Sequence, residues 1–206
     1  MDKFSIIIPT MWRSDKIMDM LPEYDNSEYV GEMILIDNDP ELKPDLSLYK
    51  KLRYYTKGHN IYVNPAWNWG AELANYQIIL ANDDIIVDNI DKVLGLINEK
   101  DFDIVGILLR KAKTKDMAIV KLGHWPNAGY GCFMYVRNYK KIPDELLIWY
   151  GDRYLFKHNT KKGRLINGGI HTNTSTTIDS DREFFRENIG KQDQINKHRL
   201  VKEGKF

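Results

Sequence analysis

Three short apolar runs in the first half of the chain place the strongest limit on how it can fold. They span Phe4 to Ile8, Met33 to Ile36 and Gln77 to Ala81, and none shows strict alternation with polar residues. Such runs are typical of strands buried on both faces of a parallel sheet. Each run stops abruptly at polar residues, which are Pro9-Thr10, Asp37-Asn38-Asp39 and Asn82-Asp83-Asp84.

Helix signals separate these runs. The expected intervening elements are a helix from Ser14 to Leu21 ended by Pro22, a short strand at Ile61 to Val63, a helix from Asn64-Pro65 through Leu73, and a helical face at Val93 to Ile97. Alternating strands and helices predict an α/β fold with an open, mostly parallel sheet flanked by helices. Ligands bind such sheets beyond the carboxyl ends of the strands. Thr10, Asp37 and the Asn82-Asp83-Asp84 segment are therefore predicted to meet.

The second half of the chain has a less regular pattern, which predicts antiparallel or mixed strands. The expected elements are strands at Asp103 to Leu109, Met117 to Leu122 and Tyr130 to Val136, a helix opened by Pro143 that carries Trp149 to Phe156, a strand or loop at Leu165 to Thr172, and a charged C-terminal helix capped by Ser180. Its charges from Arg182 to Lys205 are expected to form a solvated face or a junction to a further domain.

Length and composition indicate one globular domain. The 206 residues suffice for one α/β core and are too few for two, while 43% hydrophobic and 29% charged residues are ordinary values for a folded protein. A net charge of +1 argues against a broad nucleic-acid-binding surface. The lone Cys132 excludes an internal disulfide and favours the cytosol. No window approaches the ~18 to 20 apolar residues of a membrane span, so a soluble protein is expected.

The adjacent carboxylates of Asp83 and Asp84 are the strongest chemical signal. Two neighbouring carboxylates after a buried strand repel each other and call for a compensating cation. Hard cations such as Mg²⁺ or Mn²⁺ take carboxylate oxygens and keep positions open for substrate phosphates. The alternative interpretation is a capped turn that opens the next helix, because Asp and Asn are favoured there.

With Thr10 and Asp37, these residues resemble the GT-A nucleotide-sugar glycosyltransferases, in particular the inverting family 2. The resemblance covers most of the chain and rests on Phe4-Ser-Ile-Ile-Ile-Pro-Thr10, Asp37, Asn68-Trp69-Gly70 and Asn82-Asp83-Asp84. It extends to viral enzymes that glycosylate capsid proteins, in which such a domain is followed by others. It implies that residues 1–206 are one GT-A domain, of the kind that forms the N-terminal part of a longer protein. The implied location is cytoplasmic, in the host cell if the protein is viral.

The resemblance also implies roles for individual residues. Asp84 corresponds to the direct metal ligand, Asp83 to a ribose or outer contact, and Asp37 to the residue that meets the uracil base. The implied UDP-sugar contacts are Thr10, Arg13, Asp37, Asn68, Asn82 and Asp83. The family's Asp-x-Asp motif has Asn82 in its first place here. The implied reaction transfers a hexose-type sugar to a hydroxyl of a glycan or glycoprotein, with Mn²⁺ or Mg²⁺ stabilising the departing diphosphate.

Residues of the second half complete the expected site. Asp152 corresponds to the general base in the family's Glu-Asp pair, with Gly151 in place of the Glu, and its alternative role is a helix cap. His171 matches a late histidine that reaches the metal or diphosphate in several relatives, and could equally be a loop residue. His124 and Trp125 are expected at the acceptor, although core packing is as plausible for the tryptophan.

Other functions are open or excluded. A sugar nucleotidyltransferase shares this sheet but needs a glycine-rich loop after the first strand, where this chain has Thr10 to Ser14 without glycine. The glycine fingerprints of dehydrogenases and phosphate-loop NTPases are absent from the sequence. A non-catalytic nucleotide-sugar-binding module stays possible, because Asn82 and Gly151 depart from the family pattern.

Overall fold

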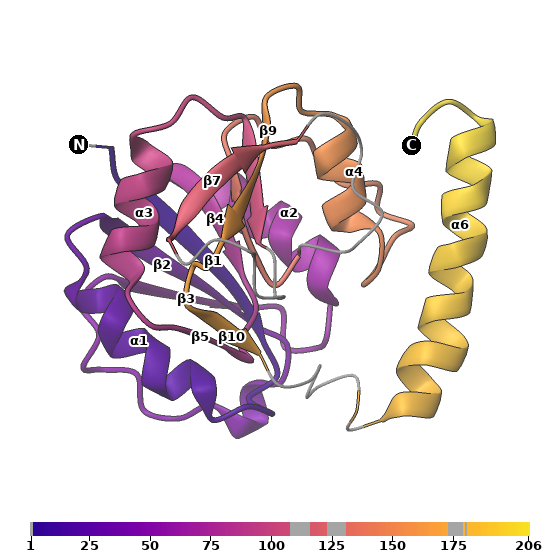
Figure 1. Ribbon diagram of the computed structural model, residues 1–206. Coiled ribbons are helices and arrows are strands. Elements are labelled where there is room, and N and C mark those ends of the chain that lie inside the picture. Colours follow the sequence, from indigo (N-terminus) through magenta and orange to yellow (C-terminus); the bar gives the residue numbers. More distant parts are fainter. Residues whose placement is uncertain (1, 108–115, 123–130, 173–178, 180) are drawn as a thin grey trace.

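A computed structural model describes residues 2–107, 116–122, 131–172, 179 and 181–206, and Figure 1 shows its α/β architecture. The strands are β1 (Phe4–Thr10), β2 (Val30–Asp37), β3 (Leu52–Thr56), β4 (Gln77–Ala81), β5 (Ile85–Val87), β6 (Ile104–Ile107), β7 (Ala118–Lys121), β8 (Phe133–Val136), β9 (Lys162–Ile166) and β10 (Ile170–Thr172). The helices are α1 (Lys16–Asn26), α2 (Val63–Leu73), α3 (Ile90–Asn98), α4 (Gly151–Lys157) and α6 (Lys191–Lys202), with a 3₁₀ turn at Pro40–Leu42 and a π-helical stretch at Glu183–Gly190.

The central sheet is mixed and mostly parallel, which confirms the predicted fold class. Among the described residues its order is β3-β2-β1-β4-β8-β6-β9-β7. β1 pairs in parallel with β2 and β4, and β2 pairs in parallel with β3. β8 enters antiparallel between β4 and β6. A separate antiparallel pair joins β5 to β10.

Helices cover both faces of the sheet, because its central strands are apolar on both sides. Ile6 and Ile8 of β1 enter one core cluster with α1 and α3, while Ile7 enters a second cluster with α2 and α4. Figure 1 shows α1 and α3 on one side of the strands and α2, α4 and α6 on the other. No helix within the described ranges is long and apolar enough to cross a membrane.

The prediction that Pro22 ends the first helix is wrong. α1 continues to Asn26 and contains Pro22 in its interior. Proline removes one backbone hydrogen bond there. The helix persists because Leu21 and Tyr24, on either side of the proline, are buried in the core.

The predicted strand at Ile61 to Val63 is also wrong. Ile61 lies in a connecting segment, and α2 begins at Val63. The strand of this region is β3, which pairs with β2 from within the Lys- and Tyr-rich segment that was expected to be a polar connection. All residues of β3 are half-buried, as suits an edge strand, so it lacks the apolar run of the central strands.

The predicted helix opening at Pro143 is wrong as well, because helical structure begins only at Gly151. The preceding segment is held in a non-helical path by bonds from distant elements. Asn64 of α2 and Asp193 of α6 satisfy backbone groups of residues 146–149, which a helix would have satisfied locally.

Candidate active site

The carboxyl ends of β1, β2 and β4 bring the first group of predicted site residues together. Thr10 ends β1 opposite Asp37 at the end of β2, and the Asn38 amide donates to the Thr10 carbonyl at 2.8 Å. On its other side, the Thr10 hydroxyl donates to Asp83 Oδ2 at 2.8 Å. Thr10 therefore connects Asp37 with the acidic pair that follows β4.

The acidic pair is buried and electrostatically coupled. Asp83 and Asp84 are both buried, and Lys16 Nζ of α1 donates to the Asp84 carbonyl at 3.2 Å. Burial, opposed by the hydrogen bond from Thr10 and assisted by the negative charge of Asp84, raises the pKa of the Asp83 carboxyl to about 6. The sequence analysis missed Lys16. A basic residue shortly after the first strand could have indicated a contact with the acidic pair.

These carboxylates have the chemistry of a divalent cation site. Hard oxygen ligands at a strand end suit Mn²⁺ or Mg²⁺, and a nearby cation offsets the repulsion that raises the pKa of Asp83. Within the part of the chain that the structure describes, no group of three or more His, Cys, Asp or Glu side chains could hold a metal.

Asp37 is completely covered in this structure. Its Oδ1 accepts a hydrogen bond from the Asp39 amide and its Oδ2 one from the Tyr54 hydroxyl, both at 2.8 Å. Burial and the bond to Asp37 raise the pKa of Tyr54 to about 12, so the hydroxyl stays protonated and donates. At the same edge, Arg13 pairs with Asp39 at 2.8 Å and is 42% exposed.

A second part of the candidate site is formed by the residues just before β8 and by the first turn of α4. A Cβ added to Gly131 would lie 3.2 Å from Trp67 Cη2 and 3.3 Å from Asp152 Cβ, so Gly131 lets α2 and α4 approach each other closely. The Cys132 carbonyl, next in sequence, accepts from the Asn82 amide at 2.8 Å. Gly131 was missed in the sequence, where its only signal is a glycine at the head of an apolar run.

Gly131 and Cys132 connect the segment after β4 with the start of α4, because the Cys132 carbonyl accepts from the Asn82 amide and Gly131 packs against Asp152. Burial, together with the negative charges of Asp84 and Asp152, raises the pKa of the Cys132 thiol to about 12. Both carboxylates therefore act on the same thiol, although they are far apart in sequence. The segment before β8 therefore lies between the end of β4 and the start of α4 in its contacts.

The comparisons with known proteins agree with this geometry at the level of the fold. No protein-family model matches the sequence, and no curated protein matches it. The crystal structure of S. aureus TarS matches with a TM-score of 0.58 and 14% identity, over 94% of this chain and 42% of TarS. That of GalNAc-T7 with UDP, GalNAc and Mn²⁺ matches with a TM-score of 0.63 and 16% identity, over 83% of this chain and 43% of GalNAc-T7.

A crystal structure of a mycobacterial protein matches with a TM-score of 0.58 and 12% identity, over 84% of this chain and 68% of that one. The chain spans less than half the length of the TarS and GalNAc-T7 structures. Its mixed sheet and flanking helices match those of GT-A glycosyltransferases. The chain has a GT-A fold.

Within this GT-A fold, Gly151 stands where the resemblance has an acidic residue, and the structure gives the reason. A Cβ at position 151 would lie 2.1 Å from Asn64 Oδ1, so no side chain fits without displacing the Asn64 side chain. The Asn64 amide group in turn donates to the carbonyls of Leu146 and Trp149. The departure at Gly151 is therefore part of how this chain packs α4 against α2.

Two other residues of the GT-A resemblance face the protein interior or its edge. Asn68 accepts from the Tyr139 hydroxyl and the Ile142 amide and donates to the Ile142 carbonyl, so its amide joins α2 to the segment after β8. Trp69 packs edge-on against Tyr55 of β3, away from Trp67 and Gly131. Of the two tryptophans, Trp67 is the one that contacts the candidate site.

The remaining site residues of the GT-A resemblance lie on β10 or outside the described residues. His171 on β10 pairs with Ile86 of β5, and its Nε2 lies 2.9 Å from Asp88 Oδ2. Both side chains of that ion pair are 60% exposed. His124 and Trp125 lie outside the described residues.

Proposed function

We propose that the chain is a metal-dependent glycosyltransferase that moves a hexose-type sugar from a UDP-sugar to a hydroxyl of a glycan or glycoprotein, as viral capsid glycosyltransferases do. One observation supports it most strongly. The Asn82 amide, next to the acidic pair after β4, donates to the Cys132 carbonyl, and the neighbouring Gly131 packs against Asp152 at the start of α4, so the two halves of a donor-and-acceptor site lie next to each other.

The acidic pair is proposed to hold the diphosphate end of the donor. Asp84 is the proposed metal ligand, and Asp83, fixed by Thr10, is the proposed ribose or outer contact. When bound, Mn²⁺ or Mg²⁺ supplies charge stabilisation for the departing diphosphate. Asn82, Arg13 and the Lys16 ammonium add polar groups at this strand edge. His171, exposed on β10 beside the strand that follows Asp84, is the proposed further contact to the metal or diphosphate, whereas Asn68 is left out because its buried amide joins α2 to Tyr139 and Ile142.

The uracil base is proposed to lie at the end of β2. A uracil N3–H can donate to Asp37 Oδ2 in place of the Tyr54 hydroxyl, which now occupies that oxygen. Adenine presents no such N–H in a matching position, so exchange of one donor for another favours UDP over ADP. Tyr54 lies on the edge strand β3 and is half-buried, which gives it room to move aside.

Asp152 is proposed as the general base. An aspartate is ionised at neutral pH and can take the proton of the acceptor hydroxyl as the oxygen attacks the anomeric carbon. The Cβ of Asp152 packs closely beside Gly131, where an added Cβ would lie 3.3 Å away. The alternative function, a non-catalytic UDP-sugar-binding module, predicts the same affinities without turnover.

The experiment is UDP release from UDP-glucose and related UDP-hexoses, with and without Mn²⁺, by the wild-type protein and Asp84→Ala. We expect Mn²⁺-dependent release by the wild type, its loss in excess EDTA, and a decrease of ~100-fold or more in Asp84→Ala with the fold unchanged by circular dichroism. Saturable UDP binding without release by the wild type would favour the binding module. Full release in EDTA would exclude the metal.

A further inference from the structure

The segment from Leu146 to Tyr150, which leads into α4, is held by α6. Asp193 of α6 is completely buried, and its Oδ1 accepts from the Leu147 amide at 2.9 Å. Its Oδ2 accepts from the amides of Ile148 and Trp149, both at 2.8 Å. A single carboxylate therefore fixes three successive backbone N–H groups just before the helix that carries Asp152.

α2 holds the same segment from its other side. Asn64 is completely buried, its amide group donates to the Leu146 and Trp149 carbonyls, and its backbone N–H donates to the Leu147 carbonyl at 2.9 Å. After this segment the chain turns at Tyr150, whose φ of 69° is in the left-handed region, and α4 begins at Gly151. The start of α4 is thus set by two side chains from distant helices.

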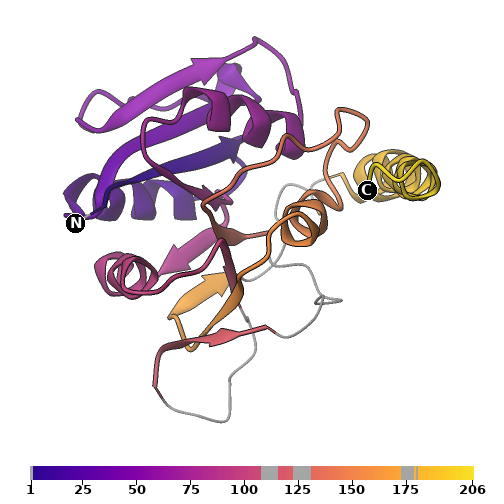
Figure 2. The same cartoon turned by 90° about the horizontal axis from the view of Figure 1, so that it is seen from above.

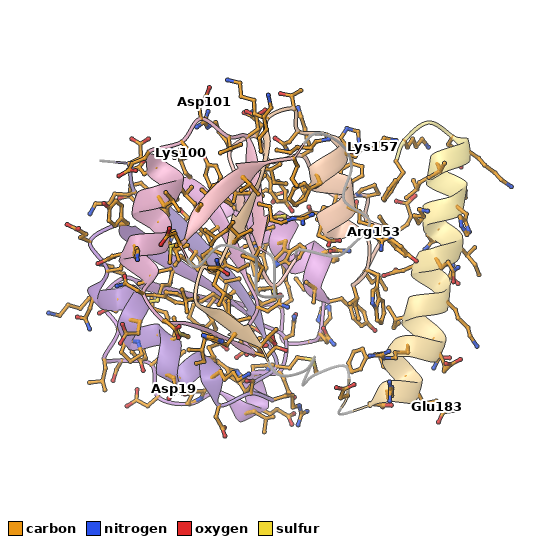
Figure 3. All side chains as sticks on the ribbon, in the orientation of Figure 1. Asp19, Lys100, Asp101, Arg153, Lys157 and Glu183 are labelled. Carbon is orange, nitrogen blue, oxygen red and sulfur yellow. The ribbon has the colours of Figure 1, made fainter. Side chains whose placement is uncertain are left out.

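α6 lies at the periphery, beyond α4, and the view along its axis in Figure 2 shows this clearly. Figure 3 places Arg153 and Lys157 on the side of α4 nearer to α6. Leu200 is the buried apolar residue of α6, whereas Ile195 and Val201 are 61% and 47% exposed. Polar contacts therefore supply much of the docking of α6 onto the segment before α4.

Docking a helix through a buried carboxylate costs desolvation free energy. Removal of a charge from water is unfavourable unless hydrogen bonds compensate it closely, and an apolar side chain would hold α6 without that cost. Three charge-assisted hydrogen bonds, in contrast, fix backbone position and direction. The choice of Asp193 therefore indicates precise placement of the segment rather than attachment of α6 alone.

We propose that Asp193 is a positioning residue for the transfer reaction. Through the amides of residues 147–149 it sets the turn at Tyr150 and the first residues of α4, and thereby the distance from Asp152 to the acceptor hydroxyl. This inference rests on the proposed function, in which Asp152 is the base. It makes α6 part of the acceptor side of the enzyme, although α6 supplies no residue to the site itself.

The test is a double-mutant cycle on sugar transfer with Asp193→Asn and Asp152→Asn. The isosteric asparagine keeps one acceptor oxygen but turns an NH₂ donor toward backbone N–H groups. We expect Asp193→Asn to lower kcat by ~10- to 100-fold, because small misplacements of catalytic groups have effects of this size. UDP affinity should stay within about twofold of wild type. The double variant should be no slower than Asp152→Asn, because Asp193 acts through Asp152.

Glu145→Gln is the matched control. Glu145 binds α6 through Arg199 at 3.1 Å, but its side chain does not hold the amides of residues 147–149. This variant weakens the docking of α6 and should leave kcat within about twofold of wild type. Amide hydrogen exchange should accelerate at residues 147–152 in Asp193→Asn and not in Glu145→Gln.

The outcomes separate the two proposals. Additive effects of the two Asp→Asn substitutions, or unchanged exchange at residues 147–152, would overturn the positioning role while an active wild type upholds the transferase. A lower Tm with wild-type kcat in Asp193→Asn would show that Asp193 serves stability alone, and would also overturn the positioning role. Absence of turnover in the wild type would overturn the proposed function, and the positioning role with it.

Discussion

At the scale of single residues, Asp83 shows how a functional carboxylate affects stability. Its pKa lies near 6 in the folded protein against an ordinary value of 3.8, chiefly because of burial and then because of Asp84. The folded state therefore holds the proton more tightly than the unfolded state. The free energy of unfolding falls as the pH rises from 3.8 to 6 and stays low above that. The loss at neutral pH is about 3 kcal/mol, from roughly 1.4 kcal/mol for each pH unit.

The first prediction from this is that Asp83→Asn stabilises the metal-free protein at neutral pH. Asparagine keeps an oxygen that accepts from Thr10 and carries no charge to desolvate. In urea unfolding with EDTA, the variant should match the wild type near pH 4 and exceed it by about 3 kcal/mol at pH 7. Asp19→Asn, at an exposed position of α1 labelled in Figure 3, is the control and should change stability little. A difference between Asp83→Asn and wild type that is the same at both pH values would contradict this account.

At the scale of elements, the close packing of α2 on β1 depends on Gly70. A Cβ at Gly70 would lie 2.3 Å from Ile7 Cγ2, a buried atom of the central strand. In a free helix, alanine in place of glycine is favourable by up to ~1 kcal/mol. Here the overlap with the strand outweighs that gain, because an overfilled core costs ~1 to 3 kcal/mol.

We therefore predict that Gly70→Ala lowers the free energy of unfolding by about 1 to 2 kcal/mol. The matched control is Gly95→Ala in α3, where the new Cβ would lie 3.0 Å from the hydroxyl of Tyr29, the far end of a flexible side chain. That substitution should be neutral or slightly stabilising by urea denaturation. Equal effects of the two substitutions would mean that helix propensity, and not contact with β1, decides.

At the scale of the whole molecule, the proposed donor site couples ligand binding to global stability. A ligand that binds only the folded state at 100 times its Kd adds about 2.7 kcal/mol. For a domain of this size, that corresponds to a rise in Tm of roughly 5 to 10 °C. UDP with Mn²⁺ should produce such a rise in differential scanning fluorimetry, ADP with Mn²⁺ a smaller one, and UDP in EDTA little.

Asp84→Ala and Asp37→Ala separate the contributions of the metal and of the uracil base to the rise in Tm. The first should remove the contribution of Mn²⁺ and the second the preference for UDP over ADP. Equal shifts with UDP and ADP in the wild type would refute the proposed contact between Asp37 and uracil. Both variants are compared with their own ligand-free Tm, because each replaces a buried residue.

The sequence alone determined the central strands and the polar residues that end them. β1, β2 and β4 are buried on both faces, so each appears in the sequence as a continuous apolar run that is followed by polar residues. Parallel pairing then brings those ends to one edge, which is why Thr10, Asp37 and Asp83 meet as expected. Local sequence patterns predicted the structure poorly where tertiary packing outweighs local propensity. Examples are Pro22 in the interior of α1 and the half-buried edge strand β3.

Only the tertiary structure decided how the second half completes the site. β8 enters antiparallel beside β4, and the residues just before it join the Cys132 carbonyl to the Asn82 amide and place Gly131 against Asp152. Asp193 and Asn64 fix the start of α4 from helices far along the chain in either direction. Such contacts join residues that are neighbours in space and remote in sequence. No local sequence periodicity or residue spacing predicts these contacts, because they form only when distant segments pack together in the folded protein.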